Sequence, residues 1–528
     1  MKTAFGIPAK QPAPMLRLSL FLAFGAGWGS CMTIPYALLF SFFAVLSITF
    51  IYLYFFRRLH YAQTFILYSA IVLFGAILSR ISLNKMLGNV PTEQQVYASV
   101  VNSSPVERGK VVQFSAYVVD GVMKGRKINM SVLKDNSSQA QQLKIGDCII
   151  AKSKFKSLRE TDSSYYNRYL YIHGFSATSF IYCKNWKKTG CGISLLPLIE
   201  RMKLRAMSIR DNIINRLKPL NMADESFSIV AAMTLGDKTY LKKQTYETYS
   251  HAGVAHILAL SGMHIGIIFM FLYSVLRSRK FDYIREAIVL FTVWAYILIV
   301  GMPLSAVRAG TMMTIFLIVS MLNTDKSSLN SLGTAAIVML LVNPLTILDI
   351  SFQLSFVAVF FLLIIGIPIS YIHPTVKSRI LQLPISWIWT LCAMSIAAQI
   401  GTLPLTLYHF GTTTPYFLFG NIIAVPSAYI IILLFGLIAP LSFCPSLQSL
   451  LSVFLSSYIE CLNSLLSAIS SLPYSDTFNI KISIPTTILL YICILLLSYC
   501  FLKYYNRYCF NKKLKKMLTT EDENYGYI

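Results

Sequence analysis

Long apolar runs separated by short polar turns dominate this chain and fall into two groups. The first group covers residues 16–30, 36–56 and 64–81. The second covers residues 254–276, 287–302, 305–322, 331–347, 350–370, 385–408, 415–440, 449–472 and 485–502. Apolar runs of about 18–20 residues can cross a hydrocarbon core, and a chain in lipid must satisfy its own backbone hydrogen bonds. We therefore predict a polytopic α-helical membrane protein with about 12 spans, give or take about two.

A polar stretch, residues 83–225, separates the two groups and has a different pattern. Short runs rich in β-branched and aromatic residues occur at 96–101, 111–119, 127–133 and 148–155, with turn residues between them. Several short strands in so few residues are typical of a small antiparallel barrel. We predict a small all-β domain of the OB type, inserted after the third span.

Positive charge orients the predicted spans. Basic residues precede the first span, follow the second and follow the last, at Lys2, Lys10, Arg17, Arg57, Arg58, Lys503, Arg507, Lys512, Lys513, Lys515 and Lys516. Because cytoplasmic loops are enriched in Lys and Arg, both termini are predicted to be cytoplasmic and the β domain periplasmic. The expected domains are membrane helices in 1–82, the OB-like domain and a connector in 83–225, a membrane channel domain in 226–502 and a basic cytoplasmic tail in 503–528.

Composition agrees with the membrane class and adds a strong positive charge. Hydrophobic residues make up 55% of the 528 residues and charged residues only 13%, about half the share usual in soluble domains. Lys and Arg number 46 against 22 Asp and Glu, which gives a formal net charge of +24. This excess suits a polyanionic partner, although the bias toward positive cytoplasmic loops accounts for part of it.

Three lysines recur at every second position in the last predicted strand, at Lys152, Lys154 and Lys156. Side chains two apart point to the same face of a strand. A basic face close to tyrosines is one way in which OB domains hold single-stranded nucleic acid, with phosphates on the charges and bases on the rings. The alternative is a solvated strand face beside core tyrosines.

Cysteine and histidine spacing argues against a metal centre. There is no C-x-x-C, HxH or HExxH motif, so no metal or other cofactor is expected. Three of the ten cysteines lie in the predicted outside domain, where an oxidising compartment permits a disulfide. We predict the pair Cys183–Cys191, which flank a short segment, with Cys148 an equally plausible partner.

Polar residues gather inside the second group of apolar runs, where they are costly and therefore mark function. Asp349 and Gln353 are four residues apart and share a helix face. Arg308 lies in an apolar run with few acids to pair with, and Asp349 is the partner we predict. The candidate binding residues are Ser261, His256, His264, Arg308, Asp349, Gln353, Gln399, His409 and Asn421. Alternatively, Arg308 and Asp349 form a purely structural ion pair and the histidines are satisfied within the bundle.

These motifs, in this order, closely resemble the ComEC family of competence DNA-uptake channels. The resemblance rests on LGD at 235–237, HILALSGMHIG at 256–266, SAVRAG at 305–310, NPLTILDISFQLSF at 343–356 and QIGTLPLTLYHFG at 399–411, followed by Asn421 and Pro426. It implies an inner-membrane channel that accepts one DNA strand from a periplasmic receptor and passes it to cytoplasmic ATPase or DNA-processing proteins.

One feature departs from many members of that family. They carry a further domain resembling metallo-β-lactamases, whose HxHxDH signature is absent from this sequence. We therefore expect no enzymatic activity in this chain and a separate nuclease as a partner. Two other functions stay open: a transporter of a small solute or lipid-linked sugar with a compact polar site, and an intramembrane hydrolase, for which no nucleophile and base pattern is visible.

Overall fold

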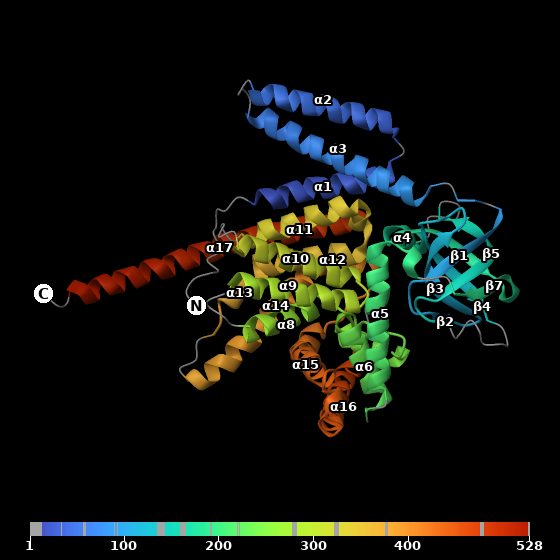
Figure 1. Cartoon of the computed structure of the whole chain (residues 1–528). Coiled ribbons are helices and arrows are strands. Elements are labelled where there is room, and N and C mark those ends of the chain that lie inside the picture. Colours follow the sequence, from blue (N-terminus) through green and yellow to red (C-terminus); the bar gives the residue numbers. More distant parts are fainter. Residues whose placement is uncertain are drawn as a thin grey trace.

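The structure is a computed structural model in which a β-barrel sits at one end of a helix bundle (Figure 1). It describes residues 13–525 apart from 33, 56–59, 89, 92, 135–142, 159–164, 191–192, 219, 221, 277–281, 322–326, 375–377 and 476–479. The bundle axes run toward the barrel, and the long C-terminal helix extends past the opposite end of the bundle (Figure 1).

Three N-terminal helices pack on one side of the bundle. They are α1 (Pro14–Cys31), α2 (Tyr36–Phe55) and α3 (His60–Met86). Helices α1 and α3 touch backbone to backbone, because a Cβ on Gly25 would lie 2.0 Å from the carbonyl oxygen of Val72. The other side of α1 meets α11 (Ser328–Val342), where a Cβ on Gly333 would lie 2.3 Å from the backbone nitrogen of Leu16. Small residues thus join the N-terminal helices to the second membrane group.

The β domain is a closed five-stranded barrel with two short additional strands. Strands β1, β3, β4, β6 and β5 pair in that order, and β5 pairs back onto β1 to close the ring. The bounds are β1 Gln94–Val101, β2 Val106–Arg108, β3 Val111–Asp120, β4 Lys127–Leu133, β5 Cys148–Ser157, β6 Phe175–Ile181 and β7 Trp186–Thr189. The four predicted strands coincide with β1, β3, β4 and β5, whereas β2, β6 and β7 were not predicted. The structure confirms a small β-barrel, but β4 and β6 pair in parallel, so the barrel is not wholly antiparallel as predicted.

Alternation along β5 places its side chains as its sequence predicts. Ala151, Ser153 and Phe155 are buried, whereas Lys152, Lys154 and Lys156 are exposed on the outer face. Inside the barrel, the hydroxyl of Tyr97 hydrogen-bonds those of Ser153 (2.9 Å) and Ser179 (2.7 Å). A buried polar cluster that satisfies itself in this way costs little and fixes the packing of the strands around it.

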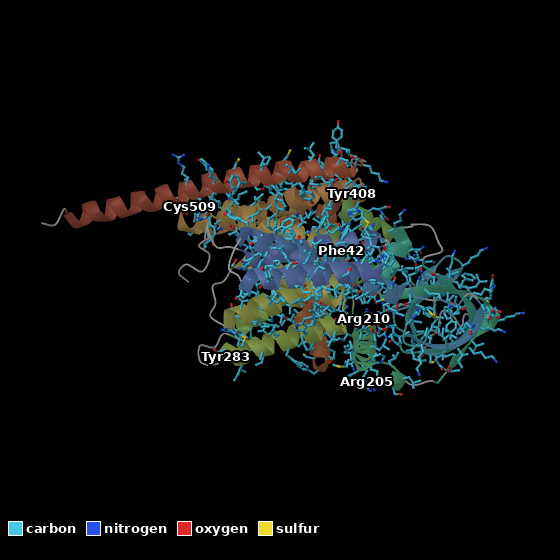
Figure 2. All side chains as sticks on the ribbon, turned by 90° about the horizontal axis from the view of Figure 1, so that it is seen from above. Phe42, Arg205, Arg210, Tyr283, Tyr408 and Cys509 are labelled. Atoms are coloured by element: carbon cyan, nitrogen blue, oxygen red, sulfur yellow. The ribbon has the colours of Figure 1, made fainter. Side chains whose placement is uncertain are left out.

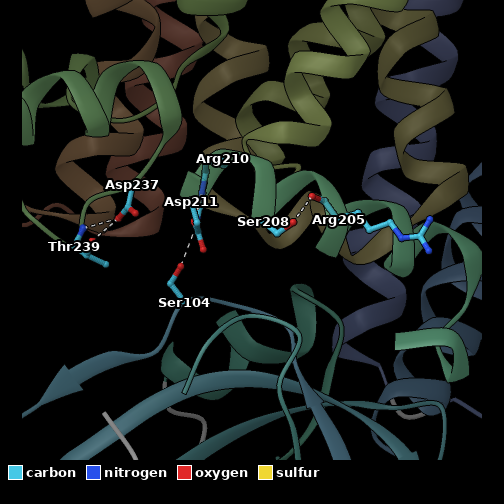
Figure 3. A network of polar contacts seen from close by, with 7 residues as sticks. All are labelled: Ser104, Arg205, Ser208, Arg210, Asp211, Asp237 and Thr239. Atoms are coloured by element: carbon cyan, nitrogen blue, oxygen red, sulfur yellow. Dashed lines mark hydrogen bonds and ion pairs between the residues drawn. The ribbon is translucent and has the colours of Figure 1, made fainter. Parts of the chain in front are cut away.

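Two helices connect the barrel to the bundle. Helix α4 (Tyr165–Ile172) lies between β5 and β6, and α5 (Leu198–Leu217) runs across the bundle ends beside the barrel (Figure 1). Leu204 of α5 packs on the barrel, while Ile214 packs in the core of the bundle. Arg210 holds the barrel loop, because its Nη2 donates to Ser104 Oγ (3.0 Å) and pairs with Asp211 (2.9 Å) (Figure 3). Arg210 lies at this junction on α5 (Figure 2).

The second membrane group contains helices α6 to α17. Their bounds are α6 Asp224–Leu235, α7 Lys243–His251, α8 Gly262–Val275, α9 Asp282–Ile299, α10 Leu304–Met321, α11 Ser328–Val342, α12 Ile350–Phe361, α13 Ile367–Ser370, α14 Arg379–His409, α15 Phe417–Ile438, α16 Pro445–Ser470 and α17 Ile484–Tyr525. A π-helical turn, Leu362–Gly366, joins α12 to α13.

Within the described residues, eight helical segments are long and apolar enough to cross a membrane. They lie on α2, α3, α10, α12 with α13, α14, α15, α16 and α17. The other four expected runs coincide with α1, α8, α9 and α11, so every predicted apolar run contains a helix, while the number of spans stays a prediction. The prediction that a membrane helix begins at residue 254 is wrong. Residues Ala255–Ile257 form a 3-10 turn, Ser261 caps the helix, and α8 starts at Gly262.

The predicted disulfide Cys183–Cys191 is wrong, because Cys183 is not in a disulfide. Cys183 is a free thiol whose Sγ donates to the carbonyl oxygens of Leu133 and Lys134. Cys148 is disulfide-bonded instead, and Cys191 lies outside the described residues. Cys183 starts a 3-10 turn after β6, and its thiol is directed onto the end of β4.

Candidate functional site

Arg308 and Asp349 form the predicted ion pair near the ends of two helices. Arg308 is in the second turn of α10, and Asp349 is the N-cap of α12, where its Oδ1 accepts from the backbone nitrogen of Ser351 (3.1 Å). Its Oδ2 lies 3.8 Å from Arg308 Nη1, and the two side chains are 5% and 9% exposed. At this distance the Arg308 guanidinium interacts with the Asp349 carboxylate through charge, but the two groups are too far apart for a hydrogen bond.

Gln353 extends the site by one helical turn, on the same face of α12 as Asp349. Its Nε2 donates to the carbonyl oxygen of Ile347 (2.8 Å), and its Oε1 lies 3.4 Å from His409 Nε2. His409 is the last residue of α14, so the pair joins the ends of two apolar helices. Asp349, Gln353 and His409 therefore gather at one end of the bundle, as expected from their placement in the motifs.

This end of the bundle faces the barrel. Asn343, the residue that precedes the 3-10 turn Pro344–Leu348, donates from Nδ2 to the carbonyl oxygen of Ile172 at the end of α4 (3.2 Å). His173 follows directly, and its Nδ1 lies 2.8 Å from the carbonyl oxygen of Tyr169. The barrel and the motif that carries Asp349 are thus in direct contact.

Cationic side chains of the barrel lie close to this contact. Burial and, to a smaller extent, the nearby Lys203 lower the pKa of Lys127 to about 8, against the opposing effect of Glu200. The pKa of His173 lies below its ordinary value because the ring is buried, and the carboxylate of Asp349 opposes that shift. Asp349 is therefore near enough to act on a barrel histidine as well as on Arg308.

A second group of predicted residues lies at the start of α8. Ser261 is the N-cap of this helix and His264 its third residue, and the two form a capping box. The backbone nitrogen of Ser261 donates to His264 Nδ1 (3.1 Å), so the ring carries its proton on Nε2. That Nε2 is buried and has no hydrogen-bond partner within the described residues. His264 is thus a fixed, buried donor.

His256 and Gln399 line a polar cavity of about 270 Å³. Its other walls are Ser250, Gly253, Ala255, Thr406, Phe410, Thr412, Thr413, Thr414 and Phe417, which include no Lys, Arg, Asp or Glu. One wall of the cavity is tied to the end of α7, where Thr414 Oγ1 donates to the carbonyl oxygen of His251 (2.8 Å). Gly253 has a φ of +78°, and a Cβ at this position would lie 2.7 Å from the Cα of Phe417. Any other residue here would therefore be strained.

Asn421 stands one turn beyond this cavity, on α15. Its Oδ1 is buried without a hydrogen-bond partner in the part of the chain that the structure describes. The neighbouring Gly420 permits α15 to touch the turn after α7, because a Cβ there would lie 2.1 Å from the carbonyl oxygen of Ala252. The polar cavity and Asn421 therefore depend on one close helix contact.

The predicted residues thus fall into three places. Arg308, Asp349, Gln353 and His409 form one cluster, and Ser261, His256, His264, Gln399 and Asn421 lie at or near the polar cavity. The lysines of β5 lie apart from both, on the outer face of the barrel. The contribution of Lys127 and His173 of the β domain was not predicted. The run Thr412–Thr414 was not predicted either, although three successive threonines between apolar helices were an available signal.

Comparison with known proteins gives one family and two curated relatives. Residues 233–504 match the model of the family described as competence protein. "ComE operon protein 3" of Bacillus subtilis is 31% identical over 335 residues, which are 62% of this chain and 39% of that relative. "Recombination protein 2" of Haemophilus influenzae is 23% identical over 266 residues, which are 48% of this chain and 32% of that relative. The chain therefore spans well under half the length of either, and no solved structure matches it.

Proposed function

This chain belongs to the ComEC family of competence proteins, and on that premise we propose that it forms the inner-membrane channel for uptake of single-stranded DNA in natural transformation. The barrel is periplasmic and both termini are cytoplasmic in this proposal. The chain receives the strand from a periplasmic DNA receptor and hands it to cytoplasmic ATPase or DNA-processing proteins. Degradation of the other strand belongs to a separate nuclease, and this chain is not an enzyme.

The observation that carries the proposal is the buried Arg308–Asp349 pair beneath the barrel. A single strand brings one negative charge per nucleotide, so a path for it needs cations that can exchange partners. Arg308 is paired with Asp349 at 3.8 Å, a separation from which phosphate can compete for the guanidinium. Lys127 of β4 lies close enough to act on His173 beside the same contact and supplies further positive charge.

The polar cavity supports a second step along the same path. Its threonine hydroxyls, His256 and Gln399 offer hydrogen bonds without formal charge from Asp, Glu, Lys or Arg. Such a surface suits the edges of unpaired bases better than phosphates. In the proposed mechanism Arg308 binds the phosphates of the strand, and the polar cavity binds its bases as the strand moves inward.

Transformation with purified DNA tests the proposal. Deleting the gene in a competent strain is expected to remove transformation, and a plasmid copy of the wild-type gene is expected to restore it. Binding of labelled double-stranded DNA at the cell surface should continue in the deletion strain, because the proposed defect lies in transport across the inner membrane. Unchanged transformation in the deletion strain would contradict the proposal.

One observation favours a second candidate, a transporter of a small solute or lipid-linked sugar. The polar cavity of about 270 Å³ is closer in size to a small solute than to a polymer. Vesicles that contain the purified protein separate the two functions. A channel for DNA protects labelled single strands from external nuclease, whereas a solute transporter leaves them digestible.

The lysines of β5 give a testable prediction for capture. Replacing Lys152, Lys154 and Lys156 together with serine is expected to weaken single-stranded DNA binding by the full-length protein in nanodiscs by roughly tenfold at low salt. Removing three phosphate contacts should also lower the slope of log affinity against log salt by about 2. Fluorescence anisotropy with labelled oligonucleotides over a salt series measures both quantities.

A charge-matched control distinguishes this face from general electrostatics. Lys110, Lys124 and Lys144 are exposed elsewhere on the barrel, and replacing them with serine removes the same charge. This control should change the affinity and the salt slope much less. Equal losses from the two triple variants would show that the β5 face is solvated surface.

A further inference from the structure

A second, larger cavity lies within the membrane group and differs in chemistry from the polar one. It has a volume of about 430 Å³ and opens between α1, α11, α12, α14 and α17. Its walls are almost entirely apolar, with Phe352, Phe356 and Phe360 along one side. The Phe352 and Phe356 rings lie 4.3 Å apart between centroids.

The cavity is elongated along the helices. Leu332, Ala336 and Leu340 line it on α11, and Phe352 to Phe360 line it on α12. Eight residues of helix rise about 12 Å, which is less than half of a hydrocarbon core about 30 Å thick. An apolar space of this kind does not hold water, and left empty it forfeits the packing contacts of its walls.

The occupant must therefore be apolar, elongated and present at membrane depth. Three of the helices around the cavity, α12, α14 and α17, are among the segments long and apolar enough to cross a membrane. At that depth the available apolar ligand is a lipid acyl chain.

Charge at the end away from the barrel narrows the choice of lipid. Arg17 is exposed next to Leu16, which lines the cavity, and Lys503 is exposed on α17, two turns beyond the lining residue Leu495. The end of the cavity near Asp349 adjoins the barrel contact instead. Basic side chains at the edge of a pocket between membrane helices favour anionic head groups.

We propose that this cavity is a binding site for one acyl chain of an anionic phospholipid, with the head group near Arg17. The chain packs against Phe352, Phe356 and Phe360 and thereby supports α12, the helix capped by Asp349. The cavity shares Gln353 with the Arg308–Asp349 cluster, but its walls are almost entirely apolar and therefore exclude phosphate. The lipid acts as a structural ligand of the membrane group.

Native mass spectrometry of the full-length protein tests the site directly. Protein released from nanodiscs of equimolar phosphatidylethanolamine and phosphatidylglycerol is expected to retain one tightly held phosphatidylglycerol. Ala336→Phe fills the cavity from α11 and should lower that retention at least about tenfold, an affinity loss of roughly 1.4 kcal/mol. Val338→Phe, on the exposed face of the same helix, is the matched control and should leave retention unchanged.

The head-group contact and the fold are tested separately. Arg17→Gln should abolish the preference for phosphatidylglycerol over phosphatidylethanolamine while one lipid stays bound. If Ala336→Phe does not yield folded protein, photo-crosslinking of the wild type with a phosphatidylglycerol carrying a photoreactive acyl chain decides the question, because labelled peptides should come from α11, α12 and α17. Equal retention by Ala336→Phe and Val338→Phe, or labels spread over exposed helices such as α2, would overturn the proposal. Loss of transformation by Ala336→Phe with normal lipid retention would assign the space to DNA and also overturn it.

Discussion

Arg308→Ala is expected to reduce transformation by roughly 100-fold or more, equivalent to about 2.7 kcal/mol for a single limiting step. The side chain is 5% exposed and is the cation paired with Asp349 beneath the barrel. Its loss removes the exchangeable partner for phosphate and leaves the carboxylate to repel the strand. Asp349 keeps its bond to the backbone of Ser351, so α12 should remain capped and the protein should insert. Transformation frequency and the amount of membrane-inserted protein are the two measurements.

Two further variants separate transport from structure. Arg308→Lys should rescue only part of the uptake, because lysine keeps the charge but lacks the planar fork that binds phosphate through two hydrogen bonds. Asp349→Asn keeps the helix cap while it removes the charge, and it should lower uptake less than Arg308→Ala does. If Asp349→Asn leaves uptake normal while Arg308→Ala prevents folding, Arg308 is a structural residue and the assignment to the path is wrong.

Gly420→Ala is expected to reduce transformation by roughly tenfold or more, through packing and without any change of charge. The added Cβ would lie 2.1 Å from the carbonyl oxygen of Ala252, so α15 must move away from the turn that contains Gly253. Overpacking of this kind costs about 1–3 kcal/mol and displaces a wall of the polar cavity. The midpoint temperature of thermal unfolding of the purified protein and the transformation frequency should both decrease.

Gly436→Ala is the matched control on the same helix. No atom lies within 4 Å of a Cβ at this position, and alanine favours a helix over glycine by roughly 1 kcal/mol. Its transformation should be normal and its thermal stability unchanged or slightly higher. Normal transformation by Gly420→Ala would show that the contact between α15 and the Ala252 turn does not shape the path.

The β5 lysines show how far a local pattern reaches. A strand repeats every two residues, so the spacing of Lys152, Lys154 and Lys156 already placed them on one face, and that face is the exposed one. Each apolar run likewise predicted a helix that the structure contains, but the runs did not predict helices α4 to α7, which lie outside them. They did not determine where α8 begins, because Ser261 and His264 cap that helix inside an apolar run.

Patterns along the sequence were enough to predict the membrane class, four strands of the barrel and the need of the buried Arg308 for an acidic partner. The reason is energetic, because an unpaired charge in hydrocarbon costs free energy and few acidic residues occur in this part of the sequence. The packing of distant segments placed that partner, Asp349, at the N-cap of α12, close to His173 and Lys127 of the β domain. It also decided that Cys148, and not Cys183, is disulfide-bonded. Periodicity reports the face of a single helix or strand, whereas contacts between distant segments depend on how those faces pack together.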